Sequence, residues 1–278
     1  MSSLAKCIAF FNKKGGSGKT TTCLSIAGWL AKKGKKVLVV DFDSQANATS
    51  GLGVDAMSSR YTMYDAVLAY CDGKRGVPIT QVILKTEIEN IHLAPSELDM
   101  SAAEVIMQDA ENRTGILNRI LADVRPLYDY ILLDLPSSLG LLSINGLCAS
   151  DQVVVPLEPS IYALEALDNI KVIFRDIRRK TRHVIDQIVV VLIRYVKSDD
   201  IFTKMFGRRS PSQEVEARLR DIFDTVFIVP DSDEIYQAQK AGLPISHFAP
   251  GSRAGKAYAA IVNSIIDGDT AVNKKIKV

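Results

Sequence analysis

Residues 12–22 read Asn-Lys-Lys-Gly-Gly-Ser-Gly-Lys-Thr-Thr-Thr and directly follow the apolar run Cys7-Ile8-Ala9-Phe10-Phe11. The end of this stretch, Gly18-Lys19-Thr20, completes the P-loop pattern G-x-x-x-x-G-K-[ST], in which backbone N–H groups hold phosphates at the N-terminus of a helix. The position of the pattern's first glycine holds Lys13. A surface turn rich in glycine and lysine is the alternative, but the strand-like run before the loop and the helical pattern after it favour phosphate binding.

The loop carries lysines on both sides of its glycines, Lys14 before them and Lys19 after them. Lys19 is placed to reach the outer phosphates of a nucleotide, and the Thr20 hydroxyl is placed to bind Mg²⁺. The second lysine needs its own anion, either on the same nucleotide or on one held by a facing subunit. We therefore predict that the whole loop binds a nucleotide, through Lys14, Gly15, Gly16, Ser17, Gly18, Lys19, Thr20 and Thr21.

The composition is that of an ordinary globular protein. The chain has 278 residues, of which 47% are hydrophobic and 24% charged, enough for one large α/β domain. A net charge of +2 calls for no nucleic-acid partner, so such binding would have to come from a local patch. There is no C-x-x-C pair, no apolar run approaches the ~20 residues of a membrane span, and the first six residues leave no room for a signal peptide. We expect a cytoplasmic protein.

Strand-length apolar runs alternate with helical patterns along most of the chain. The runs are mostly continuous, which is typical of parallel strands covered on both faces. We predict strands at 6–11, 36–41, 91–94, 129–134, 152–157, 187–193 and 226–229, and helices at 19–33, 101–109, 112–124, 163–180, 212–223 and 253–267. This repetition predicts an α/β fold with a doubly wound, mostly parallel sheet that binds ligands at the carboxyl ends of its strands.

The same pattern indicates a single domain at 1–267, followed by a polar and basic tail at 268–278. Residues 51–89 are polar and weakly periodic, and we expect surface loops and short helices there.

Two of the predicted strands end in aspartates. One leads into Asp41 and Asp43, and another leads into Asp134. An apolar strand that ends in Asp downstream of a P-loop fits the residue that holds the metal, so Thr20, Asp41 and Asp134 form the predicted metal site. Asp43 lies two residues past its strand and is better placed to orient or activate the attacking water. A helix cap or a turn is the alternative for either strand-end aspartate taken alone.

The segments 14–20, 41–49 and 134–136 occur in that order along the chain. Together they resemble the ParA/MinD family of P-loop ATPases, which have a deviant Walker A motif. Residues 137–145 and 162–167 are similar to partition ATPases of the ParA/Soj type within that family. The likeness covers nearly the whole chain.

The resemblance implies an ATPase that closes face to face as a homodimer around two ATP molecules with Mg²⁺. Lys14 would then reach the partner's phosphates, as an arginine finger does, and would act with Lys19 and Asp43 in catalysis. The family's adenine-contacting turns would fall near Arg194 and at Pro230 and Asp231. Hydrolysis would be slow and stimulated by a ParB-like or other cargo-linked activator, and the function would be to segregate or position a plasmid, a chromosome or another cargo.

Two basic runs are candidates for the non-specific DNA binding that the resemblance also implies. The first run contains Arg178 and Arg179, and the second contains Arg208 and Arg209. A closed dimer would double either patch, so that DNA affinity would depend on ATP and fall with salt. The alternative to DNA binding is that the first run is a solvated helix face and the second a surface loop. If DNA binding holds, the protein would be associated with the nucleoid.

The chain also departs from the partition proteins of the family. Residues 231–234 read Asp-Ser-Asp-Glu where those proteins commonly carry basic residues, and this stretch looks more like MinD. The main alternative is therefore a MinD-like positioning ATPase that acts at a membrane or on a protein partner without binding DNA. The tail at 268–278 has too few apolar residues for an amphipathic membrane helix, which weighs against the membrane version. An ATP-dependent ligase of the same P-loop class and a nucleotide-gated scaffold are further alternatives.

Overall fold

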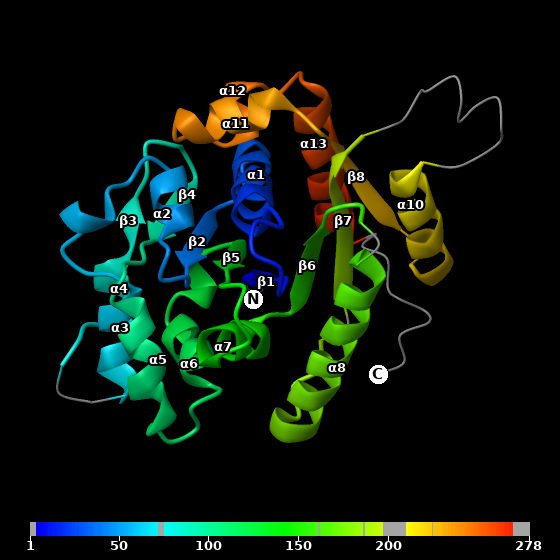
Figure 1. Cartoon of the computed structure of the whole chain (residues 1–278). Helices are drawn as coiled ribbons and strands as arrows, with labels where there is room; N and C mark the ends of the chain where they lie inside the picture. The colour runs from blue at the N-terminus through cyan, green and yellow to red at the C-terminus, as the bar shows by residue number, and fades with distance from the viewer. Residues whose placement is uncertain are drawn as a thin grey trace, which may run out of the picture.

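The described residues form one eight-stranded sheet with helices on both faces (Figure 1). The computed structural model describes residues 4–71, 75–160, 162–185, 187–196, 210–223 and 225–268. The sheet order is β3-β4-β2-β5-β1-β6-β7-β8, and every neighbouring pair is parallel except β3 with β4. The strands are β1 (Lys6–Phe10), β2 (Val37–Asp41), β3 (Leu84–Lys85), β4 (Ile91–Ala94), β5 (Tyr130–Asp134), β6 (Gln152–Leu157), β7 (Gln187–Tyr195) and β8 (Val226–Pro230). The predicted fold class is confirmed.

The helices divide between the two faces of the sheet. One face carries α1 (Lys19–Lys32), α2 (Asn47–Gly51), α11 (Asp233–Lys240), α12 (Ile245–Phe248) and α13 (Arg253–Asp267). The other carries α3 (Met63–Cys71), α4 (Ile79–Val82), α5 (Met100–Gln108), α6 (Ile116–Ala122), α7 (Leu141–Ala149), α8 (Ala163–Thr181) and α10 (Pro211–Ile222). Short 3-10 turns, η1 (Ala56–Ser58) and η2 (Arg125–Leu127), lie in the connections.

Alternate side chains of each central strand enter two apolar layers. In β1, Ile8 and Phe10 pack in the layer under α1 and α13, whereas Cys7 and Ala9 pack in the opposite layer. All five residues of β5 are buried. Because both faces of these strands are covered, their sequences read as continuous apolar runs.

The predicted strands are all present with ends that differ by at most two residues, and the predicted helices agree as well, with one exception. The exception is the helix predicted at 112–124, because α6 begins only at Ile116 and ends at Ala122, after which η2 follows. The sequence pattern does not predict β3, α7, α11 or α12. Helix α7 lacks a polar face of helical period, because Leu142, Asn145 and Leu147 are all buried. Helix α3 lies in the stretch expected to hold surface loops and short helices, but it buries Met63, Ala66 and Val67 in the core.

The carboxyl ends of the parallel strands meet at one edge of the sheet, where the P-loop follows β1. Strand β1 lies at the centre of the sheet between β5 and β6, while β2, next in sequence, lies on the far side of β5. Such a change in strand order opens a crevice at the carboxyl ends of the strands. Helix α13 ends at Asp267, and residues 269–278 lie outside the described part of the chain, so the division into domain and tail stays a prediction.

Candidate functional site

Two glycines with positive φ shape the loop between β1 and α1. Gly16 has a φ of +70° and Gly18 a φ of +74°, a backbone region in which a side chain is strained. A Cβ atom at Gly18 would also lie 2.4 Å from Cδ1 of Ile193 on β7. Gly18 is the N-cap of α1, and no side chain caps this helix. The N–H groups of its first turn therefore remain available to hold an anion.

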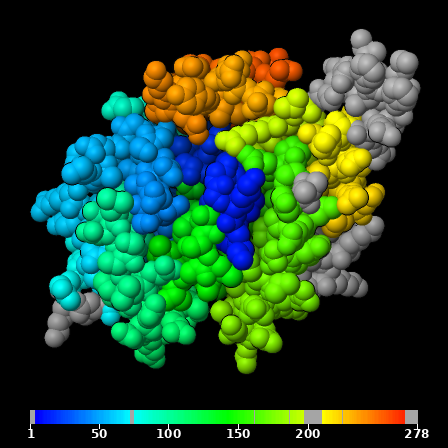
Figure 2. Space-filling model, viewed as in Figure 1, coloured from blue at the N-terminus to red at the C-terminus, as the bar shows by residue number. Residues whose placement is uncertain are grey.

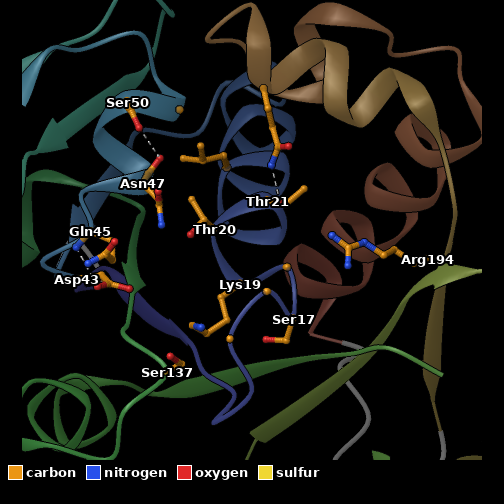
Figure 3. Close-up of a pocket in the computed structure, with 16 residues that line it drawn as sticks. Ser17, Lys19, Thr20, Thr21, Asp43, Gln45, Asn47, Ser50, Ser137 and Arg194 are labelled. Carbon is orange, nitrogen blue, oxygen red and sulfur yellow. Dashed lines mark hydrogen bonds between the residues drawn. The ribbon is translucent and has the colours of Figure 1, made fainter. Parts of the chain in front are cut away.

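A cavity of about 590 Å³ opens beside this loop, a size that suits a nucleotide. Figure 3 shows Lys19 in the middle of the cavity, with Asp43 on one side and Arg194 on the other. Figure 2 shows the P-loop, in blue, at the surface in the centre of this face. The cavity is lined by Gly15, Gly16, Ser17, Gly18, Lys19, Thr20, Thr21, Leu24, Asp43, Gln45, Asn47, Ser50, Gly51, Ser137, Arg194 and Gln239.

Thr20 lines this cavity, and behind it lies Asp134, which is buried and, like Asp41, is not among the lining residues. Oγ1 of Thr20 donates a hydrogen bond of 2.7 Å to Oδ2 of Asp134. The other carboxyl oxygen of Asp134, Oδ1, is buried and has no hydrogen-bond partner among the described residues. Burial, and then the neighbouring Asp41, raise the pKa of Asp134 to about 8. An orphaned buried oxygen beside a hydroxyl is a fit for a Mg²⁺ ion with its water shell.

Asp41 holds a loop in place. Its Oδ2 accepts hydrogen bonds from the backbone N of Thr49 at 2.7 Å and from Oγ1 of Thr49 at 2.8 Å, and its Oδ1 accepts one from the backbone N of Asp43 at 3.3 Å. Burial raises the pKa of Asp41 to about 6, although the bonds from Thr49 oppose that shift. Asp41 does not line the cavity, so its predicted metal role stays a prediction. What the structure shows is an anchor for the segment that carries Asp43.

Lys19 and Asp43 both face the cavity. The Lys19 side chain is buried, and burial lowers its pKa, while the charges of Asp134 and Asp43 act in the opposite direction. Asp43 comes from the loop after β2, where its Oδ1 accepts a hydrogen bond of 3.1 Å from the backbone N of Gln45 (Figure 3). The cavity thus places a cation and a carboxylate on different sides of the space where an anionic ligand would lie.

Lys14 lies outside the cavity lining, whereas the predicted Arg194 lies within it. The ammonium group of Lys14 pairs with the carboxylate of Glu158, the residue after β6, and so does the guanidinium group of Arg194. Arg194 has a φ of +50° and falls where the register between β7 and β8 shifts. No motif in the sequence assigns a role to Glu158.

Pro230 and Asp231 do not line the cavity. Pro230 ends β8, and the backbone N of Asp231 donates to the carbonyl O of Tyr195 at 3.2 Å. Their adenine role stays a prediction. Gln239 of α11 reaches the cavity instead, and its Nε2 donates to Oγ1 of Thr21 at 2.7 Å. Ser137 also lines the cavity and begins the stretch 137–145 that resembles partition ATPases, whereas Gln239 belongs to no motif and is revealed only by the tertiary structure.

The first basic run lies at the end of α8. Arg178 and Arg179 are exposed there, with Arg179 paired to Asp176 at 3.7 Å. Three more cations, Arg175, Lys180 and Arg182, are exposed on the same segment. Such residues at a helix C-terminus also complement the helix dipole. Arg208 and Arg209 lie outside the described residues.

The described residues contain no group of three or more His, Cys, Asp or Glu side chains that could hold a metal ion by themselves. No helix in this part of the chain combines the length and the apolar character that a membrane crossing requires.

Comparison with known proteins gives matches over most of the chain. A family model described as an AAA domain matches residues 5–187. The chromosome-partitioning ATPase Soj of Treponema pallidum (strain Nichols) is 34% identical over 270 residues, which cover 96% of this chain and 99% of that protein.

Two solved structures are similar in fold. A cobyrinic acid a,c-diamide synthase from Mycobacterium smegmatis, with bound ATP analogue and magnesium, has a TM-score of 0.77 at 24% identity and covers 97% of this chain and 99% of its own. The septum site-determining protein MinD from Pyrococcus horikoshii, complexed with Mg-ADP, has a TM-score of 0.72 at 22% identity. The match covers 96% of this chain and 99% of that chain. At these identities the two structures support the fold alone.

Proposed function

The chain belongs to the ParA/MinD family of P-loop ATPases, and from this premise we propose that it hydrolyses ATP to segregate or position a large cargo. In this proposal ATP and Mg²⁺ drive closure of a homodimer, the dimer binds DNA non-specifically, and a cargo-linked activator of the ParB type stimulates slow hydrolysis. The Soj relative, named as a chromosome-partitioning ATPase, supports a plasmid or chromosome as the cargo.

The observation that carries the ATPase proposal is the pairing of Thr20 with Asp134 at the open start of α1. The uncapped N–H groups of α1 and the Lys19 ammonium would hold the phosphates. Thr20 would hold Mg²⁺ directly, and Asp134 would hold its waters through the oxygen that lacks a protein partner. A bound Mg²⁺ would supply neutralisation of the charge that develops on the phosphate oxygens.

Asp43 is the residue we propose to act on the attacking water. Its carboxylate lines the cavity, and its loop is tied to the sheet through Asp41. Water attacks the terminal phosphorus, the bond to the leaving ADP oxygen breaks, and the water's proton passes to Asp43 or, through it, to the departing phosphate. Lys19 stays beside the phosphates and offsets their charge throughout.

The dimer proposal rests on Lys14. Its side chain is 56% exposed and lies outside the cavity of its own chain. A lysine on the rim of a P-loop is positioned to meet the phosphates of a subunit that closes over it. Removing the charge of Lys14 is therefore expected to affect dimer closure more than nucleotide binding.

The DNA proposal rests on the exposed cations of α8. Two copies in a dimer would join into a larger basic surface, and the phosphate backbone of DNA would release counterions on binding. The acidic stretch at 231–234 has a structural account that does not involve DNA, because Asp233 and Glu234 lie in the first turn of α11. Acidic side chains in that position stabilise a helix through its dipole.

A DNA-binding assay with ATP, with ADP and without nucleotide, across a salt series, tests this function. We expect binding only with ATP, and a steep loss of affinity as salt rises. The double variant Arg178→Glu, Arg179→Glu should reduce the DNA affinity measured with ATP. The double variant Asp168→Lys, Asp176→Lys changes two other residues of the same helix and should not reduce it. If ATP induces no DNA binding at low salt, the result favours the MinD-like alternative, a positioning ATPase that does not bind DNA. Vesicle sedimentation with ATP then asks whether the chain acts at a membrane.

A further inference from the structure

Glu158 lies between two cations that belong to different parts of the proposed machinery. It follows β6 directly, with Lys14 of the P-loop on one side and Arg194 of β7 on the other. Its Oε2 accepts the Lys14 ammonium at 2.5 Å, and its Oε1 pairs with Nη1 of Arg194. Each carboxylate oxygen therefore has one cationic partner.

The backbone of the P-loop is fixed so that Lys14 must pass close to Glu158. Nδ2 of the buried Asn12 donates to the carbonyl O of Pro156, near the end of β6, at 2.7 Å. Oδ1 of the same Asn12 accepts the backbone N–H of Lys14 at 3.0 Å. The Asn12 side chain thus ties the start of the loop to the strand that leads into Glu158. The contact between Lys14 and Glu158 follows from this anchoring and from charge.

The charge of Glu158 is well defined. Hydrogen bonding from Lys14 is the largest cause that holds the pKa of its carboxyl below the ordinary value, although partial burial opposes it. Only 21% of the Glu158 side chain is exposed, whereas the Lys14 side chain is 56% exposed. The carboxylate is thus a partly enclosed, ionised group in contact with a more exposed ammonium group.

We propose that Glu158 is a positioning residue that holds Lys14 against its own chain until the phosphates of a facing subunit take its place. The inference rests on the proposed sandwich dimer. A terminal phosphate offers more negative charge and more acceptor oxygens than one carboxylate. Glu158 also divides its charge between Lys14 and Arg194, which weakens its hold on either. Lys14 therefore leaves Glu158 when the ATP of a facing subunit is presented to it, and it stays paired with Glu158 when no such anion is near.

The size of the effect follows from the exposure of the pair. An ion pair of this kind shifts an equilibrium by about two- to fivefold. A symmetric dimer releases two such pairs, so the effect on dimer association is the square of that figure, about 4- to 25-fold. Removing the Glu158 charge should therefore make the dimer form at lower ATP concentration.

The first experiment measures the contact directly in the single chain. The full-length protein without nucleotide is treated with an amine-acetylating reagent, and modification of each lysine is followed by mass spectrometry. Glu158→Gln should raise the rate at Lys14 by about two- to fivefold, because the ion pair no longer shields it. The adjacent Lys13, which has no ion pair with a described residue, is the internal control and should not change. An unchanged rate at Lys14 overturns the inference.

The second experiment measures the consequence for assembly. ATP-dependent dimerisation is followed by sedimentation in a background of Asp43→Ala, so that hydrolysis does not empty the site. Glu158→Gln should lower the ATP midpoint, while Asp168→Asn, which removes an equal charge from α8, should leave it unchanged. Binding of a fluorescent ATP analogue to single chains is measured in parallel. Arg194 lines the cavity and Lys14 does not, so an effect of Glu158→Gln through Arg194 would change this affinity, whereas an effect through Lys14 would not.

The outcomes separate this inference from the proposed function. If the Asp43→Ala protein never dimerises with ATP, the sandwich proposal fails, while the labelling result still reports on the contact. If it dimerises and Lys14→Ala weakens the dimer, but Glu158→Gln leaves the midpoint unchanged or raises it, the positioning role of Glu158 is overturned.

Discussion

Asp41 and Asp134 lie opposite each other, in register, on the neighbouring strands β2 and β5, and both side chains are buried. Their partners differ, since Thr49 donates to Asp41 and Thr20 donates to Asp134. Two carboxyl groups in one apolar setting resist ionising together. Asp41 keeps its contacts with the loop that follows β2, whereas Asp134 contacts the P-loop helix through Thr20 and is the carboxyl group that we propose to hold the metal.

The buried carboxyl group of Asp134 should make stability depend on pH. Its pKa is raised from 3.8 to about 8 in the folded chain, so between these pH values the folded state holds a proton that the unfolded state lacks. The free energy of unfolding then falls as pH rises through that window, by up to about 1.4 kcal/mol per pH unit from this group. Asp134→Asn should flatten this slope in urea titrations without nucleotide.

The same substitution should abolish the Mg²⁺ dependence of nucleotide binding, because the amide offers no negative charge to the waters of the ion. Asp129→Asn is a control, since this exposed side chain accepts a hydrogen bond from the backbone N of Lys36 at the other end of the strand. The raised pKa of Asp134 is contradicted if the unfolding free energy of the wild type falls no more between pH 5 and pH 8 than that of Asp134→Asn.

Thr49 should be important for stability as well as for the position of Asp43. Its hydroxyl donates to Asp41 at 2.8 Å and accepts the backbone N–H of Ser96 at 3.0 Å. Thr49→Val keeps the shape but leaves both buried partners short of a bond, which costs about 1–3 kcal/mol. The melting temperature should fall by about 3–10 °C. Ser58→Ala, which removes an exposed hydroxyl, should change it by less than about 2 °C.

Much of this site is readable in the sequence, because backbone chemistry dictates it. Glycines at positive φ and a lysine at the start of a helix form a local motif, and buried parallel strands give continuous apolar runs. The pairing of Asp41 with Asp134 depends on strand order, which no local pattern contains. Glu158 and Gln239 escape prediction for the same reason, since each meets the P-loop only after β6 and α11 have packed beside it.

Lys14 should separate nucleotide binding from assembly. Because its side chain lies outside the cavity, Lys14→Ala should leave the affinity of the single chain for ATP within about threefold. Hydrolysis should fall by about 100-fold or more, as it does when a cation supplied in trans is lost. Lys13→Ala is the matched control, because this lysine is one residue away and is also exposed, and the variant should retain dimerisation and hydrolysis. A Lys14→Ala protein that dimerises and hydrolyses normally would exclude the role in trans.

Asp43→Ala should trap the ATP-bound dimer. The substitution removes the carboxylate that we assign to the attacking water, while Thr20, Lys19 and the N–H groups of α1 remain to bind the nucleotide. Turnover should fall by about 10²- to 10⁴-fold. Because the dimer then opens only by dissociation of ATP, sedimentation should show a dimer that persists after free ATP is removed.

The matched control for this trap is Asp55→Ala, which removes an exposed carboxylate that caps the 3-10 turn η1 and lies outside the cavity. Its turnover and dimer lifetime should equal those of the wild type. If Asp43→Ala hydrolyses ATP at the wild-type rate, another group must activate the water. If the Asp43→Ala protein also loses ATP binding, Asp43 contributes to binding of the nucleotide rather than to the hydrolysis step. Rapid-filtration binding and phosphate release, measured on the same preparation, distinguish these results.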